Sequence, residues 1–169
     1  MKIRTYVLLG VIALLVMSAT TKTARMSEGT TPGYLAPRIE LLGKGSDFRF
    51  SNQSGRYTLL NFWAAYNAES RARNVQLANE VSKFSTDEIA MLSVSFDQKE
   101  SVFTETVKAD KLNADNQFWD GQGKLSNVYR KYGLKHGFRN FLIDDQGVII
   151  ATNVTAGQLS RFMRKNESK

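Results

Sequence analysis

The residues that could do chemistry in this chain gather in one short stretch, from Phe62 to Arg71. Asn67 and Ser70 stand three positions apart there, where a helix is predicted to begin, and the only histidine, His136, lies far along the chain. Cysteine is absent from the whole sequence. Its absence excludes disulfides, thiolate metal sites and every reaction in which a thiolate is the nucleophile.

Ser70 would act as a nucleophile only with a base in reach, and His136 is the sole histidine that could serve. No orienting carboxylate is evident, so we interpret His136 as a solvated loop residue. Asn67 is a favoured type for the residue that caps a helix N-terminus, and Glu69 suits the positive end of the helix dipole. The alternative is that Asn67 contacts a ligand at that terminus.

Strand and helix patterns alternate along the chain and must position these residues. Strands with buried patterns are predicted at 58–63 and 89–96, and a hairpin at 141–144 and 148–151 turns at Gly147. A leading hairpin is predicted around 43–47. The helical patterns cover 68–84, 98–111, 124–132 and 155–165. This order predicts an α/β layered fold with parallel pairing in its first part.

Apolar spacing predicts which faces of two helices are buried. In the helix at 98–111 we expect Val102, Phe103 and Val107 to point inward. In the helix at 124–132 we expect Leu125, Val128 and Tyr132 to do the same, although that prediction rests on fewer turns. Both sets are tested directly by side-chain burial.

The N-terminus has the pattern of an export signal. Two basic residues precede a continuous apolar run at 6–17, which is shorter than the ~20 residues that cross a bilayer. We predict a signal peptide or membrane anchor at 1–20, a flexible linker at 21–33 and one domain at 34–169. The domain is then exported, either periplasmic or anchored on the outer side of the cytoplasmic membrane.

The net charge of +7 is partly local to the N-terminus. Four basic residues precede the first acidic one, and the rest of the chain has 19 basic against 16 acidic residues. This mild balance gives no footprint for nucleic-acid binding. The acidic residues show no metal-ligand spacing, so we expect neither a metal nor another cofactor.

Four motifs in order resemble the exported, membrane-tethered thioredoxin-like family known as TlpA/ResA. They are Leu35-Ala-Pro-Arg-Ile-Glu-Leu41, the strand segment 55–63, the segment 92–97, and the closing segment 132–147. The resemblance covers about residues 34–165. It implies a thioredoxin fold, an α/β architecture with a central mixed sheet flanked by helices, preceded here by an N-terminal β-hairpin.

The departures from that family fall on its functional positions. The family run is Phe-Trp-Ala-x-Trp-Cys-x-Pro-Cys-Arg, so Asn67 stands where the attacking thiolate would be and Ser70 where the resolving thiol would be. An amide cannot attack a disulfide, and a hydroxyl has no accessible redox couple. Phe138 occupies the cis-proline position. Because a cis bond before a non-proline costs roughly 3–4 kcal/mol, we predict a trans Gly137–Phe138 bond and a groove filled or reshaped by the ring.

The resemblance and its departures together predict a redox-inactive peptide-binding or accessory module in the cell envelope. Its partner would be a protein or peptide, and an uncleaved leader would also contact the membrane. The alternatives are an enzyme of the thiol-disulfide oxidoreductase family or a structural subunit of an envelope complex. Candidate rim residues of the groove, with Arg73 and Lys135 as further basic neighbours, are Trp63, Tyr66, Arg71, His136 and Arg139.

Overall fold

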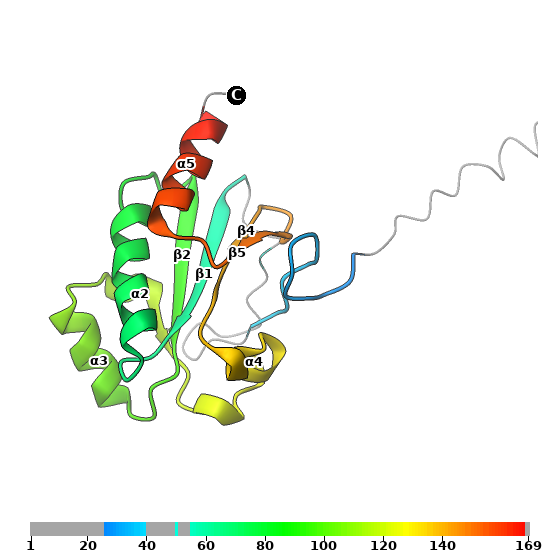
Figure 1. The fold of residues 1–169 in the computed structure, drawn as a ribbon. Helices are drawn as coiled ribbons and strands as arrows, with labels where there is room; N and C mark the ends of the chain where they lie inside the picture. Colours follow the sequence, from blue (N-terminus) through cyan, green and yellow to red (C-terminus); the bar gives the residue numbers. More distant parts are fainter. Residues whose placement is uncertain (1–25, 40–49, 51–54, 168–169) are drawn as a thin grey trace, which may run out of the picture.

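The structure, a computed structural model, describes residues 26–39, 50 and 55–167. At its centre lies a five-stranded sheet with the strand order β3-β2-β1-β4-β5 (Figure 1). The strands are β1 (Tyr57–Trp63), β2 (Ile89–Ser95), β3 (Gln117–Trp119), β4 (Asn140–Ile143) and β5 (Ile149–Thr152).

Parallel and antiparallel pairing divide the sheet as the sequence predicted. β1 pairs with β2, and β2 with β3, in parallel, whereas β4 runs antiparallel to both β1 and β5. The expected parallel first part and closing hairpin are therefore confirmed. A mixed sheet of this order, flanked by helices, is the thioredoxin fold that we expected.

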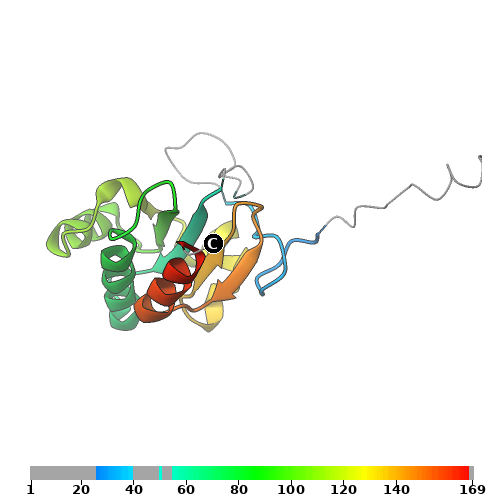
Figure 2. The same ribbon diagram turned by 90° about the horizontal axis from the view of Figure 1, so that it is seen from above.

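Helices cover both faces of the sheet. α2 and α5 lie side by side over one face, and α4 lies on the other (Figures 1 and 2). α3 stands beside α2 at the β3 edge. The bounds are α2 (Ala68–Val81), α3 (Glu100–Ala109), α4 (Asn127–Lys131) and α5 (Ala156–Glu167), with short 3-10 turns at Ala114–Asn116, Gly123–Leu125 and Leu134–His136.

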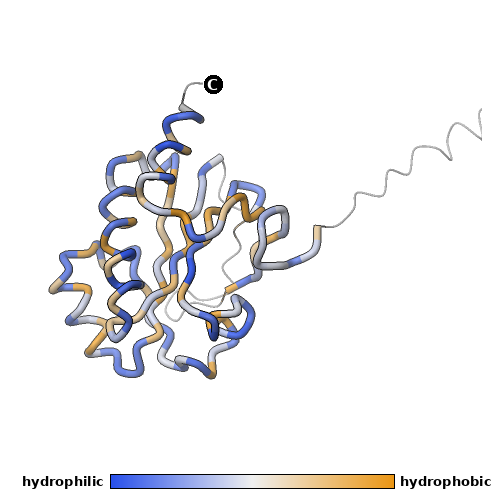
Figure 3. Tube along the Cα trace, viewed as in Figure 1, coloured by the Kyte–Doolittle hydropathy of each residue, from blue (hydrophilic) through white to orange (hydrophobic). Residues whose placement is uncertain are grey.

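Side chains that alternate along the strands build a core on each face of the sheet. Under α2 and α5, Leu59 and Leu142 pack with Leu77 and Leu159. Figure 3 shows the apolar residues concentrated along the strands, with hydrophilic residues on the outer sides of the helices. Because both helices bury an apolar stripe there, α2 is held firmly against the sheet.

The opposite core is aromatic. Phe62 lies at its centre, with ring centroids 4.9 Å from Tyr132, 5.8 Å from Phe96 and 6.1 Å from Phe141. Pairs at these separations contribute beyond the area they bury. The Tyr132 hydroxyl donates to the Pro37 carbonyl at 2.6 Å, which ties the leading segment to this core.

Ile39 and Phe50 are buried in the aromatic core, although they are far from it in sequence. The hairpin predicted between them, around 43–47, lies outside the described residues, as does the predicted leader at 1–20. Within the described part of the chain, no helix is both long and apolar enough to cross a membrane.

Two of the expected inward-facing residues are exposed, and these predictions were wrong. Leu125 is 76% exposed and Val102 is 42% exposed, whereas Val107, Val128 and Tyr132 are buried. Leu125 falls outside α4 because Ser126 is the N-cap: its hydroxyl accepts from the Val128 amide at 3.0 Å, and the helix begins at Asn127, two residues after Leu125. Val102 lies in the first turn of α3, whereas the buried residues of this helix, Thr106 and Val107, lie in its later turns.

A buried polar network fixes α2 on the sheet. The Asn74 carboxamide oxygen accepts from the Asn61 amide at 3.0 Å and from the Ser93 hydroxyl at 2.6 Å. The Asn74 amide donates in turn to the Gln117 side chain at 3.1 Å. Side chains from β1, β2, β3 and α2 thus meet at one residue, so the start of α2 cannot shift along the sheet without breaking buried hydrogen bonds.

Candidate functional site

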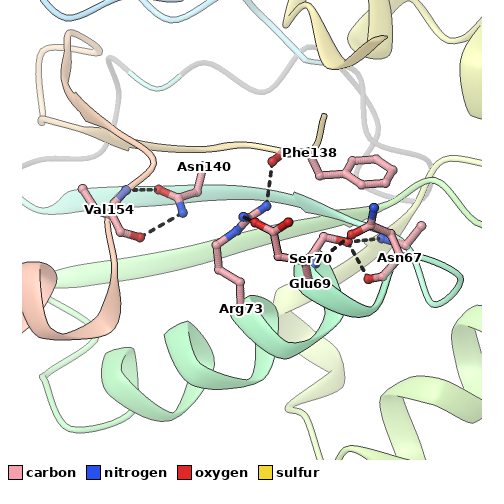
Figure 4. Close-up of polar contacts among 8 residues, drawn as sticks. Asn67, Glu69, Ser70, Arg73, Phe138, Asn140 and Val154 are labelled. Atoms are coloured by element: carbon pink, nitrogen blue, oxygen red, sulfur yellow. Dashed lines mark hydrogen bonds and ion pairs between the residues drawn. The ribbon is translucent and has the colours of Figure 1, made fainter. Parts of the chain in front are cut away.

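Asn67 caps the N-terminus of α2, as predicted. Its side-chain oxygen accepts from the Ser70 amide at 2.8 Å, and its backbone is extended, with φ −106° and ψ 96°. Both are the hallmarks of an N-cap residue. The resemblance places Asn67 where the TlpA/ResA family has its attacking thiolate. In this chain the Asn67 side chain forms a structural hydrogen bond instead (Figure 4).

Ser70 is buried, with 1% of its surface exposed. Its hydroxyl donates to the Asn67 carbonyl at 3.0 Å and accepts from the Ala64 amide at 3.3 Å. A hydroxyl that both donates to and accepts from the backbone is not activated by an imidazole. His136 is exposed on the facing loop, which agrees with its interpretation as a solvated residue.

The loop that faces Asn67 carries Phe138 at its tip. Gly137 has φ +125°, a conformation that other residues rarely adopt, and the described peptide bonds, Gly137–Phe138 included, are all trans. The Arg139 carbonyl accepts from the Phe62 amide at 3.0 Å, which extends the β1–β4 ladder into the loop. The trans Gly137–Phe138 bond that the sequence predicted is confirmed.

The Phe138 ring packs into a cluster that we call the aromatic ridge: Tyr66, Phe96, Tyr129 and Phe138. It lies parallel to the Phe96 ring at 6.1 Å, and its centroid is 6.2 Å from Tyr66 and 6.5 Å from Tyr129. Tyr66 is 65% exposed, so the ridge presents one aromatic face to solvent. Partial burial, with the nearby Tyr129 and Asp97, raises the pKa of the Tyr66 hydroxyl above its ordinary value.

Two hollows adjoin the aromatic ridge. The polar groove, of about 840 Å³, lies between α2, the Phe138 loop and the segment after β5; its lining includes Asn67, Arg73, Gln76, His136, Arg139 and Asn153. The apolar groove, of about 940 Å³, includes Tyr66, Phe96, Lys99, Val102, Lys124 and Leu125. Val102 and Leu125, whose exposure overturned our packing prediction, therefore line one of these hollows.

Arg73 reaches from α2 to the Phe138 loop, as Figure 4 shows. One terminal nitrogen donates to the Phe138 carbonyl at 2.6 Å, and the other lies 3.4 Å from the Glu69 carboxylate. The Arg73 Nε is buried, with no hydrogen-bond partner among the described residues. Burial lowers the pKa of Arg73 and Glu69 opposes that shift, but a guanidinium stays protonated at every relevant pH.

Two of the predicted rim residues do not line either groove. Arg71 turns toward α3 and donates to both carboxylate oxygens of Asp110, at 2.7 and 2.6 Å. Trp63 is fully buried, with its ring centroid 6.3 Å from that of Phe103. The structure brings Tyr66, His136 and Arg139 to the grooves, and the basic neighbour Lys135 is exposed outside them.

Sequence reasoning missed the contribution of the segment after β5. The Asn140 side chain donates to the Val154 carbonyl at 3.0 Å and accepts from the Val154 amide at 2.8 Å, which draws this segment to the groove wall (Figure 4). No local pattern marks a contact across fourteen residues. Gln76 was also missed, although its spacing of three from Arg73 places both on one helix face.

The residues at this site offer binding chemistry. Among the described residues, no group of three or more histidine, aspartate or glutamate side chains is arranged to hold a metal ion. Asn67 serves as a helix cap, and the Ser70 hydroxyl is bonded to the backbone. What the site presents to solvent is one aromatic face, two hollows and a half-buried guanidinium.

Comparisons with known proteins agree with this fold. Residues 32–152 match the AhpC/TSA family. A thioredoxin-like protein from Parabacteroides distasonis is 62% identical; the match covers 82% of this chain and 98% of that one, with a TM-score of 0.76. A thiol-disulfide oxidoreductase from Bacteroides fragilis is 28% identical over 78% of this chain and 98% of that one, with a TM-score of 0.63.

A further structure shows the fold alone. It is the thioredoxin domain of a thiol-disulfide oxidoreductase from Bacteroides vulgatus, 23% identical, with 80% of this chain and 97% of that one covered and a TM-score of 0.67. No curated protein matches the chain. The family match spans well over half of the sequence, and the chain accordingly belongs to the AhpC/TSA family of thioredoxin-like proteins.

Proposed function

We propose that this protein is a redox-inactive binding module of the cell envelope that recognises a protein or peptide partner. One observation carries the proposal: Asn67 and Ser70 stand where the resemblance places the two cysteines of the TlpA/ResA family, and both side chains are committed to local hydrogen bonds. Disulfide exchange requires a thiolate, and the chain has no sulfur nucleophile. The family fold remains, but fold alone does not fix activity.

Backbone pairing at the Phe138 loop is the physical route for binding. The Gly137 carbonyl and the Phe138 amide have no hydrogen-bond partner within the described part of the chain. An extended peptide can satisfy such groups as an added strand, which provides affinity without a fixed sequence. Tyr66, exposed beside this loop, offers the aromatic surface on which a peptide side chain rests.

The apolar groove supplies a place for an apolar side chain of the same peptide. Tyr66, Val102 and Leu125 are three of the large exposed hydrophobic residues in the described chain, and all three line this groove. Lys99 and Lys124 stand at its rim, whereas the Asp97 carboxylate is taken up by the Ala65 amide and the Ser95 hydroxyl. The groove therefore suits an apolar residue with acidic neighbours.

The envelope location rests on the sequence. A basic start and the apolar run at 6–17 support export, with the domain periplasmic or held at the outer side of the cytoplasmic membrane. The motifs at 35–41, 55–63, 92–97 and 132–147 support the TlpA/ResA subtype within the thioredoxin-like proteins. Expression of the full chain with a C-terminal reporter, followed by fractionation and N-terminal sequencing, tests both export and cleavage.

Site-specific photocrosslinking tests the binding role. A photoreactive amino acid replaces Tyr66 in the full chain, in its native host, and a second variant carries it at Tyr34, which is also exposed but remote from both grooves. We expect a discrete crosslinked partner from position 66 and none from position 34. Crosslinks from position 34 alone would favour the alternative of a structural subunit that docks through another face.

An insulin-reduction assay tests redox inactivity. The purified domain, with dithiothreitol as the electron donor, should match the rate without protein, because no group in the chain can form a mixed disulfide. Turnover above that rate would reject the proposal and favour the alternative of an enzyme of the oxidoreductase family. The assay is independent of the crosslinking, so each half of the proposal can fail alone.

A further inference from the structure

We propose that the polar groove is a carboxylate-binding site in which Arg73 recognises an acidic group of the bound peptide. This inference rests on the proposed function, since it names the chemistry that the peptide must carry. It concerns specificity, whereas the Phe138 loop and the apolar groove concern affinity for any extended chain. The charge of Arg73, its surroundings and its place beside the loop all support this role.

The positive charge of Arg73 is incompletely compensated. Its side chain is only 20% exposed, and Glu69, the acidic residue paired with it among the described residues, is 87% exposed and approaches to 3.4 Å. A solvent-exposed ion pair of that length contributes little and exchanges readily with other anions. The Phe138 carbonyl neutralises no charge, and Nε has no partner among the described residues. A half-buried guanidinium in this state favours a second carboxylate.

The groove around Arg73 is electropositive. Of its described lining residues Glu69 alone is acidic, whereas Arg73 and His136 are basic; Arg139 also lines the groove, but its guanidinium carbon lies 5.3 Å from the centroid of the Phe141 ring. The N-terminus of α2 opens at the same wall beside Asn67, so its dipole adds to the positive potential. The amide side chains of Gln76 and Asn153 are further donors on the groove walls. An anion that enters meets donors on several sides.

The position of Arg73 links the groove to the peptide. The same guanidinium that would bind the carboxylate holds the Phe138 carbonyl, beside the backbone groups that we propose for strand pairing. Side chains of a strand alternate between its two sides, so a residue next to the pairing point can extend toward the groove. The carboxylate could come from an internal aspartate or glutamate, or from the C-terminus of the peptide.

Selection from displayed peptides tests the inference and separates these sources. One phage library displays random internal dodecapeptides, and a second displays them with free C-termini. We expect peptides selected on the full exported chain to carry an acidic residue at a fixed distance from an apolar one. Enrichment confined to the second library, with no acidic side chain, would assign the site to a terminal carboxylate.

Two substitutions give opposite shifts that a merely structural role of Arg73 would not produce. R73Q should weaken binding of a selected acidic peptide at least tenfold, because it removes a charge-assisted hydrogen bond. E69Q should strengthen it roughly two- to fivefold, since it removes an exposed competitor and leaves the Arg73–Phe138 contact intact. R161Q, which removes an exposed charge from α5, is the matched control and should leave binding unchanged.

The outcomes separate this inference from the proposed function. If selected peptides bind at Tyr66 but show no acidic preference, or if R73Q and E69Q leave their affinities unchanged, the carboxylate site is wrong and the binding module survives. If neither library enriches any peptide that depends on Tyr66, both ideas fail. An R73Q protein with altered amide spectra is replaced by R73K, which retains the charge and should keep part of the affinity.

Discussion

Single residues at the start of α2 have structural roles in this chain. The Asn67 side chain accepts from the Ser70 amide, one of the N–H groups that a helix N-terminus leaves open. The Ser70 hydroxyl donates to the Asn67 carbonyl and accepts from the Ala64 amide, just before the helix. The N-terminal dipole that lowers a thiol pKa in an active relative here favours an asparagine cap. The same local field supports either outcome, so residue type alone decides the chemistry.

The cap makes a measurable prediction at this scale. Asn67→Ala should lower the free energy of unfolding by about 1 kcal/mol, because the Ser70 amide loses its partner. Urea denaturation followed by circular dichroism measures the change. Asn67→Asp keeps an acceptor at the same place and should stay within a few tenths of the parent. An alanine variant as stable as the parent would show that the cap contributes nothing.

The ion pair of Arg71 with Asp110 gives a prediction about pH. The hydrogen bond from Arg71 lowers the pKa of Asp110 below its usual 3.8, so the pair stabilises the fold above about pH 4. The contribution is lost as the pH falls through the lowered pKa. Arg71→Gln should therefore destabilise the protein by about 0.5–1 kcal/mol at pH 7 and by progressively less as the pH falls through the lowered pKa of Asp110.

Unfolding curves of both proteins across that pH range check the sign. The difference between parent and Arg71→Gln should close only on the acidic side. If the difference persists unchanged at acidic pH, Arg71 stabilises the fold through the packing of its long side chain and not through its charge. Binding of selected peptides should be unaffected, because Arg71 lines neither groove.

At the scale of elements, the segment after β5 depends on one side chain. Asn140 is fully buried and holds both the amide and the carbonyl of Val154. Asn140→Ala would leave these groups without partners, and we expect a loss of about 2–3 kcal/mol in the free energy of unfolding. Because the segment forms a wall of the polar groove, peptide binding should weaken with it.

Hydrogen exchange locates the effect. The Val154 amide should exchange faster in Asn140→Ala than in the parent under native conditions, while amides at the centre of β1 keep their protection. Asn153→Gly, in the same segment but exposed, serves as the control and should leave the Val154 amide slow, because glycine adopts the φ of +54° at this position without strain. Unchanged exchange at Val154 in the Asn140 variant would mean that the backbone hydrogen bonds between β4 and β5 are enough to hold this segment.

Most elements could be predicted because their patterns are local. The strands at 57–63 and 89–95 are mostly apolar and buried, and α2 and α5 have apolar stripes that repeat over three turns. β3 could not be predicted, since its three residues show no period and it exists only by pairing with β2. The start of α4 after Ser126 was missed although serine is a usual cap, because Leu125 fitted the apolar spacing.

The candidate site was predictable only in part. The resemblance placed Asn67, Ser70 and Phe138 on facing elements, and the structure confirms that the two elements meet across the groove. The resemblance did not predict that Arg71 turns to Asp110 whereas Arg73 turns to Phe138. Residues two apart on a helix point in different directions, so these two arginines meet different neighbours. The direction of a long charged side chain depends on partners that are remote in sequence.

At the scale of the whole molecule, the question is whether the fold can support disulfide exchange, the chemistry of the thiol-disulfide oxidoreductases that it resembles. The Ser70 hydroxyl and the Asn67 carbonyl are 3.0 Å apart, and residues at this spacing on a helix lie within the range that a disulfide spans. N67C/S70C should therefore form an intramolecular disulfide in air. A thiol at position 67 would also sit at a helix N-terminus, which lowers its pKa.

Catalysis by that double variant should be limited by Phe138. Its ring fills the space beside Phe96 and Tyr66, where the disulfide of a substrate would have to approach the new thiol. We expect N67C/S70C to reduce insulin slowly and N67C/S70C/F138P to do so at least tenfold faster, with N67C/S70C/F138A separating removal of the ring from the effect of proline. The cysteines could pair while even the triple variant gives no turnover. In that case the surface around positions 67 and 70, and not only the absence of cysteine, is unsuited to disulfide substrates.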